Sequence, residues 1–193
     1  MIYIPNVAYR DGGKKTVLDI YSRLLNMGII FIDGPIAINS CSLFLASILH
    51  IRNDLMLDKV TVYINSPGGM VYSGLAIVNI MESSDIKIET YSVGMSMSAA
   101  SIILAAGTPG LRRSLYRSRI MIHQPIGGTQ GQSTDICIYA NEIDYLKKHI
   151  ADLYAKFSNK KSSAFFLEAM ERDKYLSAQD AQDFGIIDEI VSK

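Results

Sequence analysis

Residues 59–69 read KVTVYINSPGG, and this stretch contains the clearest structural pattern in the chain. Lys59 to Ile64 form a β-branched run that favours a strand. The Pro67-Gly68-Gly69 sequence that follows predicts a turn, and a helix is expected over residues 73–81. The stretch therefore predicts a strand, a glycine-containing turn and a helix, in that order.

The same alternation continues on both sides of this stretch. The helix expected over residues 134–157 has an apolar residue at every seventh position, and Ser177 is expected to be the N-cap of the last helix. Further strands are expected at residues 29–32, 86–93, 119–123 and 186–191. Further helices are expected to begin at residue 40 and after residue 163, and another to follow the serine-rich segment after residue 94 and end at about residue 106. Short strands that are each followed by a helix indicate the α/β class. Residues 1–16 have no sustained period and are expected to form an arm, or a hairpin around residues 11–13.

Composition limits the classes of protein that fit. A length of 193 residues suggests one domain, or one domain with a projecting element. Hydrophobic residues make up 49% of the chain and charged residues 20%, which excludes disorder as the dominant state. Lys and Arg number 19 and Asp and Glu also number 19, so no global basic field attracts nucleic acid or an anionic membrane.

The two cysteines indicate a reducing compartment. Cys41 and Cys137 lack C-x-x-C spacing, which argues against a disulfide framework or a zinc site. The N-terminus has no secretory pattern. The uncharged run 90–111 is long enough to span a bilayer, but serine, glycine and proline interrupt it, so we expect buried core there. A cytoplasmic protein fits these observations.

Two features are candidates for a site. Gly68 and Gly69 follow a strand and precede a helix, so their N–H groups could converge on an anion or an oxyanion. An ordinary strand-to-helix turn has the same spacing. Ser96, Ser98 and Ser101 lie at the start of an apolar helix, where a serine is either an N-cap or a nucleophile.

A nucleophilic serine needs a base, and the chain has three histidines. His50 and His149 lie within helical patterns and are expected to flank apolar faces. His123 instead ends a strand, the place where α/β sheets present catalytic groups. Residues 94–98 imitate the nucleophile elbow G-x-S-x-G but lack its last glycine. In an α/β-hydrolase the histidine follows both the serine and the acid in the chain, and the only histidine that could do so is His149, inside a helix. An α/β-hydrolase is therefore excluded.

From about residue 18 to residue 191 the chain resembles the proteolytic subunit of the Clp protease, a serine peptidase. The motifs that carry the resemblance are DIYSRLL at 19–25, YINSPGG at 63–69, GLAI at 74–77, MIHQP at 121–125, GG at 127–128, QGQ at 130–132, ERD at 171–173 and LSA at 176–178. The resemblance implies that Ser98 is the nucleophile, His123 the general base and Asp173 the third member of a triad. No metal or cofactor is implied.

The resemblance also implies how a peptide would bind. Backbone N–H groups of Gly68 and Ala99 would form the oxyanion hole. Residues on both sides of an extended peptide would pair with it as strands, namely Gly69, Met70, Pro125 and Ile126.

The chain departs from the family pattern around Ser98. Ala100 replaces a glycine there and adds a methyl group at a tight helix start. A catalytically weak or inactive structural ring subunit is therefore a second hypothesis beside the active peptidase. A crotonase-type acyl-CoA enzyme with the same oxyanion hole is a third, more distant one.

The family architecture implies a crotonase-like spiral of ββα units and two stacked heptameric rings, homo-oligomeric or mixed with a paralogous subunit. Residues 1–17 would form an axial loop that touches an AAA+ unfoldase, the Clp ATPase, which delivers unfolded polypeptides. Residues 18–193 would be one peptidase domain that includes a handle at about 125–158. Arginines 112, 113, 117 and 119 are expected to form a solvated or subunit-interface patch. The compartment implied is the cytoplasm, or an organelle stroma or matrix.

Overall fold

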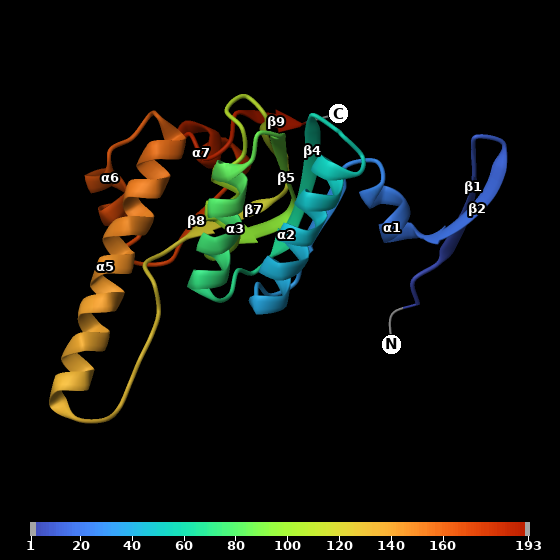
Figure 1. Ribbon diagram of the computed structural model, residues 1–193. Coiled ribbons are helices and arrows are strands. Elements are labelled where there is room, and N and C mark those ends of the chain that lie inside the picture. Colours follow the sequence, from blue (N-terminus) through green and yellow to red (C-terminus); the bar gives the residue numbers. More distant parts are fainter. Residues whose placement is uncertain (1–2, 192–193) are drawn as a thin grey trace.

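The computed structural model describes residues 3–191 and has the expected mixture of strands and helices (Figure 1). The strands are β1 (Asn6–Asp11), β2 (Lys14–Asp19), β3 (Ile29–Asp33), β4 (Lys59–Ser66), β5 (Lys87–Met97), β6 (Arg112–Leu115), β7 (Arg119–Ile122), β8 (Lys174–Leu176) and β9 (Glu189–Val191). The helices are α1 (Ile20–Leu25), α2 (Ile38–Asn53), α3 (Val71–Ser83), α4 (Ala99–Ala105), α5 (Ser133–Ser158), α6 (Ser163–Ala169) and α7 (Ala178–Asp183).

The main sheet has seven strands and is mostly parallel. Its main path is β3-β4-β5-β6-β9, and β7 joins it beside β5, with β8 paired to β7. All of these pairs are parallel except β7–β8. The α/β class predicted from the alternating pattern is therefore confirmed.

Strand β5 is longer than the sequence predicts. The expected strand ends at residue 93, with Ser96 placed at the start of a helix, but β5 runs on to Met97. Residues 90–92 pair with β6, whereas residues 95–97 pair with Arg119 to Met121 of β7. The prediction was wrong here because strand partners far along the chain satisfy the backbone, which local periodicity does not record. Ser96 consequently lies in a strand and is fully buried.

The core lies between the sheet and its helices. Val60, Val62 and Ile64 of β4 are completely buried at alternate positions, as the period of a strand requires. Helices α2 and α3 lie side by side over one face in Figure 1. Every residue of α4 is buried, which confirms the expected core for that part of the run 90–111, whereas residues 93–95 and 109–110 are exposed. In residues 3–191, no helix has both the length and the apolar character needed to cross a bilayer.

The N-terminal segment forms the expected hairpin. Strands β1 and β2 pair antiparallel from Asn6↔Asp19 to Asp11↔Lys14, with Gly12 and Gly13 at the turn in positive φ. Asp19 then caps α1, because its side chain accepts a hydrogen bond from the Ser22 N–H at 3.0 Å. The hairpin lies apart from the sheet in Figure 1.

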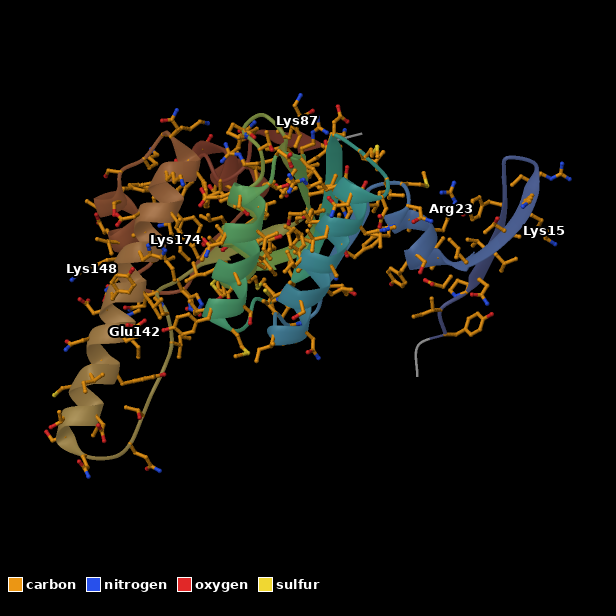
Figure 2. The ribbon with its side chains drawn as sticks, viewed as in Figure 1. Lys15, Arg23, Lys87, Glu142, Lys148 and Lys174 are labelled. Carbon is orange, nitrogen blue, oxygen red and sulfur yellow. The ribbon has the colours of Figure 1, made fainter. Side chains whose placement is uncertain are left out.

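Helix α5 is half buried and half exposed along its length. Its second half packs on the core through Leu146, Ile150 and Tyr154. In its first half, which extends beyond the sheet in Figure 1, Ile136 is 41% exposed. Lys148 lies on the side of α5 away from the sheet (Figure 2). The seven-residue apolar stripe is therefore covered only in part.

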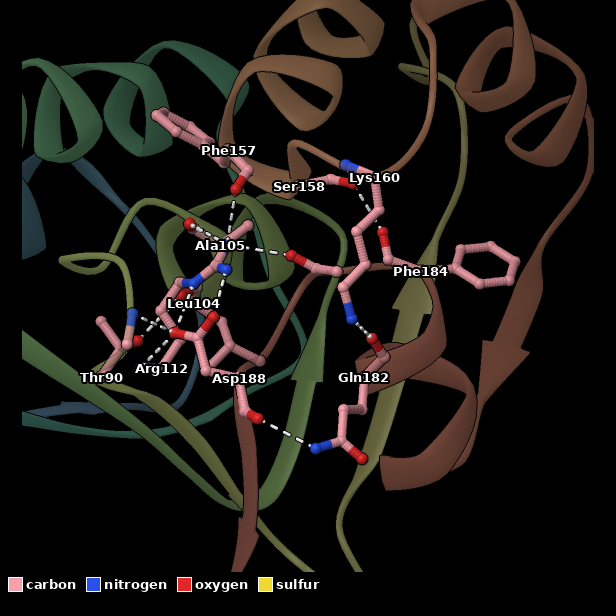
Figure 3. A network of polar contacts seen from close by, with 12 residues as sticks. Thr90, Leu104, Ala105, Arg112, Phe157, Ser158, Lys160, Gln182, Phe184 and Asp188 are labelled. Atoms are coloured by element: carbon pink, nitrogen blue, oxygen red, sulfur yellow. Dashed lines mark hydrogen bonds and ion pairs between the residues drawn. The ribbon is translucent and has the colours of Figure 1, made fainter.

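The arginine cluster is not the single surface patch expected from the sequence. Arg112 is buried and donates from its Nε to Asp188 Oδ2 at 2.9 Å and from Nη1 to the Phe157 and Gly185 carbonyls (Figure 3). Arg113 forms ion pairs with Glu89 and Glu189. The expectation was wrong for Arg112 because residues 112–115 form β6, an unpredicted strand that turns alternate side chains inward. Arg117 and Arg119 are exposed, as expected.

Candidate active site

Ser98 lies between the end of β5 and the start of α4 in a conformation that serine rarely adopts. Its φ is 54° and its ψ is −127°, in a region that costs a non-glycine residue free energy. Its N–H donates to the Met121 carbonyl of β7 at 2.9 Å. Ser98 occupies the N-cap position of α4, but its hydroxyl makes no capping bond. The side chain is directed to a different partner.

That partner is His123, the first residue after β7. His123 Nε2 lies 2.8 Å from Ser98 Oγ, and its other ring nitrogen, Nδ1, lies 3.3 Å from Asp173 Oδ1. The His123 side chain is 13% exposed, whereas that of Asp173 is 57% exposed. The three side chains thus form a chain of contacts from serine to imidazole to carboxylate.

The pairing of β7 with β8 explains how Asp173 reaches His123. The two strands are antiparallel, and Ile122 is opposite Lys174. The residue after Ile122 and the residue before Lys174 are therefore neighbours across the strands. Because β8 was not predicted, the sequence offered only the family motif as a reason to place Asp173 here.

Gly68 is packed against the Ser98 backbone. A Cβ at this position would lie 2.5 Å from the Met97 carbonyl oxygen, 2.6 Å from Ser98 Cβ and 3.1 Å from the Ala99 nitrogen. The φ of Gly68 is 91°, so both space and backbone conformation require glycine. The Gly68 N–H donates to Ser66 Oγ at 3.1 Å. The Ala99 N–H opens α4, where a helix provides no acceptor of its own.

Residues 68–70 have one paired edge and one open edge. Ile36 donates to the Gly68 carbonyl, and Met70 donates to the Ile36 carbonyl, both at 2.9 Å. Ile36 thus forms a parallel bridge with the 68–70 segment on one side. The N–H and C=O of Gly69 point to the other side of the segment, where no strand within the described part of the chain is paired. Met70 is 50% exposed and Ile126 is 81% exposed. An extended peptide could therefore add a strand beside Gly69.

A cavity of about 270 Å³ adjoins Ser98 and His123. It brings together the predicted residues Gly69, Ala99, Pro125 and Ile126, but Gly68, Met70 and Asp173 do not line it. The rest of its lining is mostly apolar and consists of Pro67, Val71, Ile102, Met121, Gln124, Ile150 and Tyr154. None of these wall residues was predicted to line a site. Pro67, Met121 and Gln124 lie within the quoted family motifs and Ile150 in the seven-residue stripe of α5, and these were the signals available.

The other serines and histidines considered from the sequence lie elsewhere or have other partners. Ser96 Oγ donates to Ser92 Oγ at 2.8 Å inside the sheet. His50 contacts Asp54 on the exposed side of α2, and His149 stacks on Tyr145. Among residues 3–191, no group of three or more potential metal-ligating side chains is clustered.

Two titratable groups near the site have shifted pKa values. Burial raises the pKa of the Tyr154 phenol, although a hydrogen bond with Ser101 opposes this effect, so the phenol is neutral at physiological pH. The pKa of the Glu171 carboxyl is lowered by a hydrogen bond from Lys147. The cavity thus has apolar walls and neutral hydroxyls beside one histidine.

Comparison with known protein families gives one match that covers most of the chain. The family model described as Clp protease matches residues 12–193.

Proposed function

Because the chain belongs to the Clp protease family, we propose that it is a serine endopeptidase subunit that cleaves unfolded polypeptides inside a ring-shaped chamber. The observation that carries this proposal is the 2.8 Å contact between His123 Nε2 and Ser98 Oγ. A serine hydroxyl is a weak nucleophile at neutral pH, and a base within hydrogen-bond distance activates it.

The proposed reaction begins with attack of Ser98 Oγ on a peptide carbonyl. His123 accepts the hydroxyl proton, and Asp173 orients the imidazole and stabilises the imidazolium. The oxyanion is stabilised by the N–H groups of Gly68 and Ala99, the first of which gives up its contact with Ser66 for a charged acceptor. His123 then protonates the leaving amine, and water hydrolyses the acyl-enzyme by the same route.

The substrate is an extended peptide with an apolar side chain beside the scissile bond. Gly69, Met70, Pro125 and Ile126 form the two sides of the cleft in this proposal. The cavity walls, which include Val71, Ile102 and Ile150, favour an apolar side chain of moderate size. A carboxylate would lose its hydration there without a cationic partner.

The assembly is part of the same proposal. Two stacked seven-membered rings, of one or two kinds of subunit, would enclose the sites, and a Clp ATPase of the AAA+ class would deliver substrates. The exposed apolar residues Ile136, Ile138 and Tyr139 on the first half of α5 support a handle that contacts another subunit. Residues 1–17 are the proposed axial segment and residues 18–193 the proposed peptidase domain, of which residues 1–2 and 192–193 lie outside the part of the chain that the structure describes. Two free cysteines fit a cytoplasmic or organelle compartment.

The structural-subunit hypothesis is not favoured. Ala100 is fully buried, and its methyl group leaves Ser98 within hydrogen-bond distance of His123. A subunit that served only as a wall would not need this contact.

Replacement of Ser98 tests the proposal. Ser98→Ala is expected to abolish both labelling by a fluorophosphonate and hydrolysis of a short fluorogenic peptide, because no other serine within residues 3–191 hydrogen-bonds to His123. Ser42→Ala, which removes an exposed hydroxyl from α2, is the matched control and is expected to retain both. Hydrolysis at the wild-type rate in Ser98→Ala would overturn the assignment of the nucleophile. Mass measurement in solution tests the assembly separately, since a single-subunit mass with and without a Clp ATPase would contradict it.

A further inference from the structure

Ser101 and Tyr154 form a buried hydroxyl pair directly behind the nucleophile. Ser101 Oγ lies 2.6 Å from the Ser98 carbonyl oxygen, 2.9 Å from the Met121 carbonyl oxygen and 2.6 Å from the Tyr154 hydroxyl. Ser101 is completely buried, and Tyr154 is 2% exposed. Neither residue takes part in the proposed proton transfer.

The arrangement of acceptors fixes the direction of these hydrogen bonds. Ser101 has a single hydroxyl hydrogen and faces two carbonyl oxygens, which only accept. If that hydrogen pointed to Tyr154, both carbonyls would oppose an oxygen lone pair at short distance. Tyr154 therefore donates to Ser101, and Ser101 shares its one hydrogen between the carbonyls of Ser98 and Met121.

These bonds join four segments that the site depends on. Tyr154 belongs to α5, Ser101 to α4, Ser98 to the β5–α4 junction and Met121 to β7, two residues before His123. The Ser98 carbonyl also accepts from the Ser101 N–H at 2.9 Å. The Ser101 hydroxyl and the Ser101 N–H thus both donate to the Ser98 carbonyl. These two hydrogen bonds fix the ψ angle of Ser98, whose backbone is strained.

We infer that Ser101 and Tyr154 are positioning residues, which hold the Ser98 backbone and strand β7 so that Ser98 Oγ faces His123. The inference rests on the proposed peptidase function. It also assigns a role to α5, because the position of Tyr154 on that helix determines whether the Ser101 hydroxyl is held toward the two carbonyls.

Single and double replacements test the inference in the assembled protein. Tyr154→Phe and Ser101→Ala are each expected to lower kcat for a short peptide about tenfold, with a smaller change in KM, because a small displacement of reacting groups costs rate. Tyr145→Phe removes an exposed hydroxyl from the same helix and is expected to leave kcat unchanged. Either single variant with the kcat of Tyr145→Phe would overturn the inference.

The double variant separates positioning from stability. Each single variant leaves a buried hydroxyl without its partner, whereas the double variant removes both, so its thermal midpoint is expected to recover toward the wild type. Its kcat is expected to remain low, because the Ser98 and Met121 carbonyls still lack the Ser101 hydroxyl. If both kcat and the thermal midpoint of the double variant recovered, the pair would contribute only to stability, and the inference would be overturned.

A measurement independent of activity distinguishes failure of this inference from failure of the proposed function. Amide hydrogen exchange of peptides covering residues 98–102 and 119–123 is expected to accelerate in Tyr154→Phe and not in Tyr145→Phe. Unchanged exchange would overturn the positioning role. If the wild-type protein did not hydrolyse peptides, the proposed function would be contradicted. The amide hydrogen exchange measurement would then decide by itself whether Ser101 and Tyr154 position the Ser98 backbone.

Discussion

At the scale of single residues, the site depends on backbone conformations that few side chains tolerate. Ser98 is held at positive φ between a strand and a helix, and Gly68 packs so closely against it that a methyl group would overlap the Met97 carbonyl. The stability of the surrounding core supplies the free energy that keeps Ser98 in this conformation. The side chains of Ser98 and His123 are therefore within hydrogen-bond distance before any substrate binds.

Gly68→Ala tests this close packing. The added methyl group must displace the β5–α4 junction, and the Gly68 N–H would move away from the oxyanion. The rate of peptide hydrolysis is expected to fall at least about a hundredfold, the typical effect of losing one oxyanion donor. Gly128→Ala is the control, since a Cβ there meets no atom within 4 Å. Equal rates for the two variants would contradict the proposed oxyanion hole.

Asp173→Asn tests the third member of the proposed triad. An amide can present its N–H to His123 Nδ1 and thereby favour the wrong tautomer for accepting the Ser98 proton. We expect kcat to fall by at least about a hundredfold, with little change in the thermal midpoint because Asp173 is largely exposed. Asp183→Asn, at an exposed position of α7, is the control for kcat measured by the same assay. A kcat within twofold of this control would remove Asp173 from the triad.

At the scale of elements, strand β5 determines where the side chains of the proposed triad meet. Its first part pairs with β6 and its last part with β7, so Ser98 emerges beside the strand that ends at His123. Strand β8 then pairs with β7 and brings Asp173 to the same end. Helices α4 and α5 supply the cavity wall. The site is thus built at the ends of strands and supported by two helices.

The capping of α7 gives a prediction at this scale. Ser177 Oγ accepts from the Asp180 N–H at 3.1 Å, and Asp180 Oδ2 accepts from the Ser177 N–H at 2.9 Å. Ser177→Ala is expected to lower the free energy of unfolding by about 1 kcal/mol and to lower the thermal midpoint, while kcat stays unchanged. Ser42→Ala, in the interior of a helix, is expected to leave the midpoint at or above that of the wild type. The reverse order of the two midpoints would contradict the cap.

At the scale of the whole molecule, Arg112 joins the end of the sheet to the helical layer. Its guanidinium contacts Asp188 before β9, the Phe157 carbonyl at the end of α5 and the Gly185 carbonyl after α7 (Figure 3). These segments are more than 40 residues apart from Arg112 in the chain. One buried cation therefore connects the C-terminal strand to the helix that carries Tyr154.

Asp188→Asn tests this connection. Removal of the carboxylate leaves Arg112 buried without its counter-charge, and we expect a loss of about 3 kcal/mol in the free energy of unfolding. Urea denaturation monitored by circular dichroism measures the loss. Asp183→Asn, which removes an exposed carboxylate, is expected to change stability by less than about 0.5 kcal/mol. Equal stabilities of the two variants would contradict the role given to Arg112.

The pH dependence of this loss provides a second check. Burial by itself raises the pKa of the Asp188 carboxyl, but hydrogen bonds from Arg112, its positive charge and a hydrogen bond from the Gly110 N–H together outweigh burial, and the net pKa is lowered. A folded pKa below the unfolded value stabilises the protein above the unfolded pKa of about 3.9, and this contribution disappears as pH falls through the folded pKa. The difference between wild type and Asp188→Asn should therefore be full near pH 7 and shrink below about pH 4. A difference that grew on acidification would contradict the assignment.

The sequence by itself determined the alternation of strands and helices, the N-terminal hairpin, the Ser177 cap and the candidacy of Gly68, His123 and the serine cluster. These follow from local patterns, because β-branched runs, glycine-containing turns and capping residues act on their neighbours in the chain. The strand end before His123 was visible for the same reason, whereas the end of β5 before Ser98 was not, because the expected strand stopped at residue 93.

Only the tertiary structure decided the features that depend on partners far along the chain. Strand β5 continues past Gly94 because β7 pairs with it, and Arg112 is buried because Asp188 lies opposite, neither of which leaves a local pattern. The meeting of Asp173 with His123 needed the β7–β8 pairing, and the contact of Tyr154 with Ser101 needed α5 to pack on α4. Hydrogen bonds and burial between distant segments have no period in the sequence, so they appear only when the chain is folded.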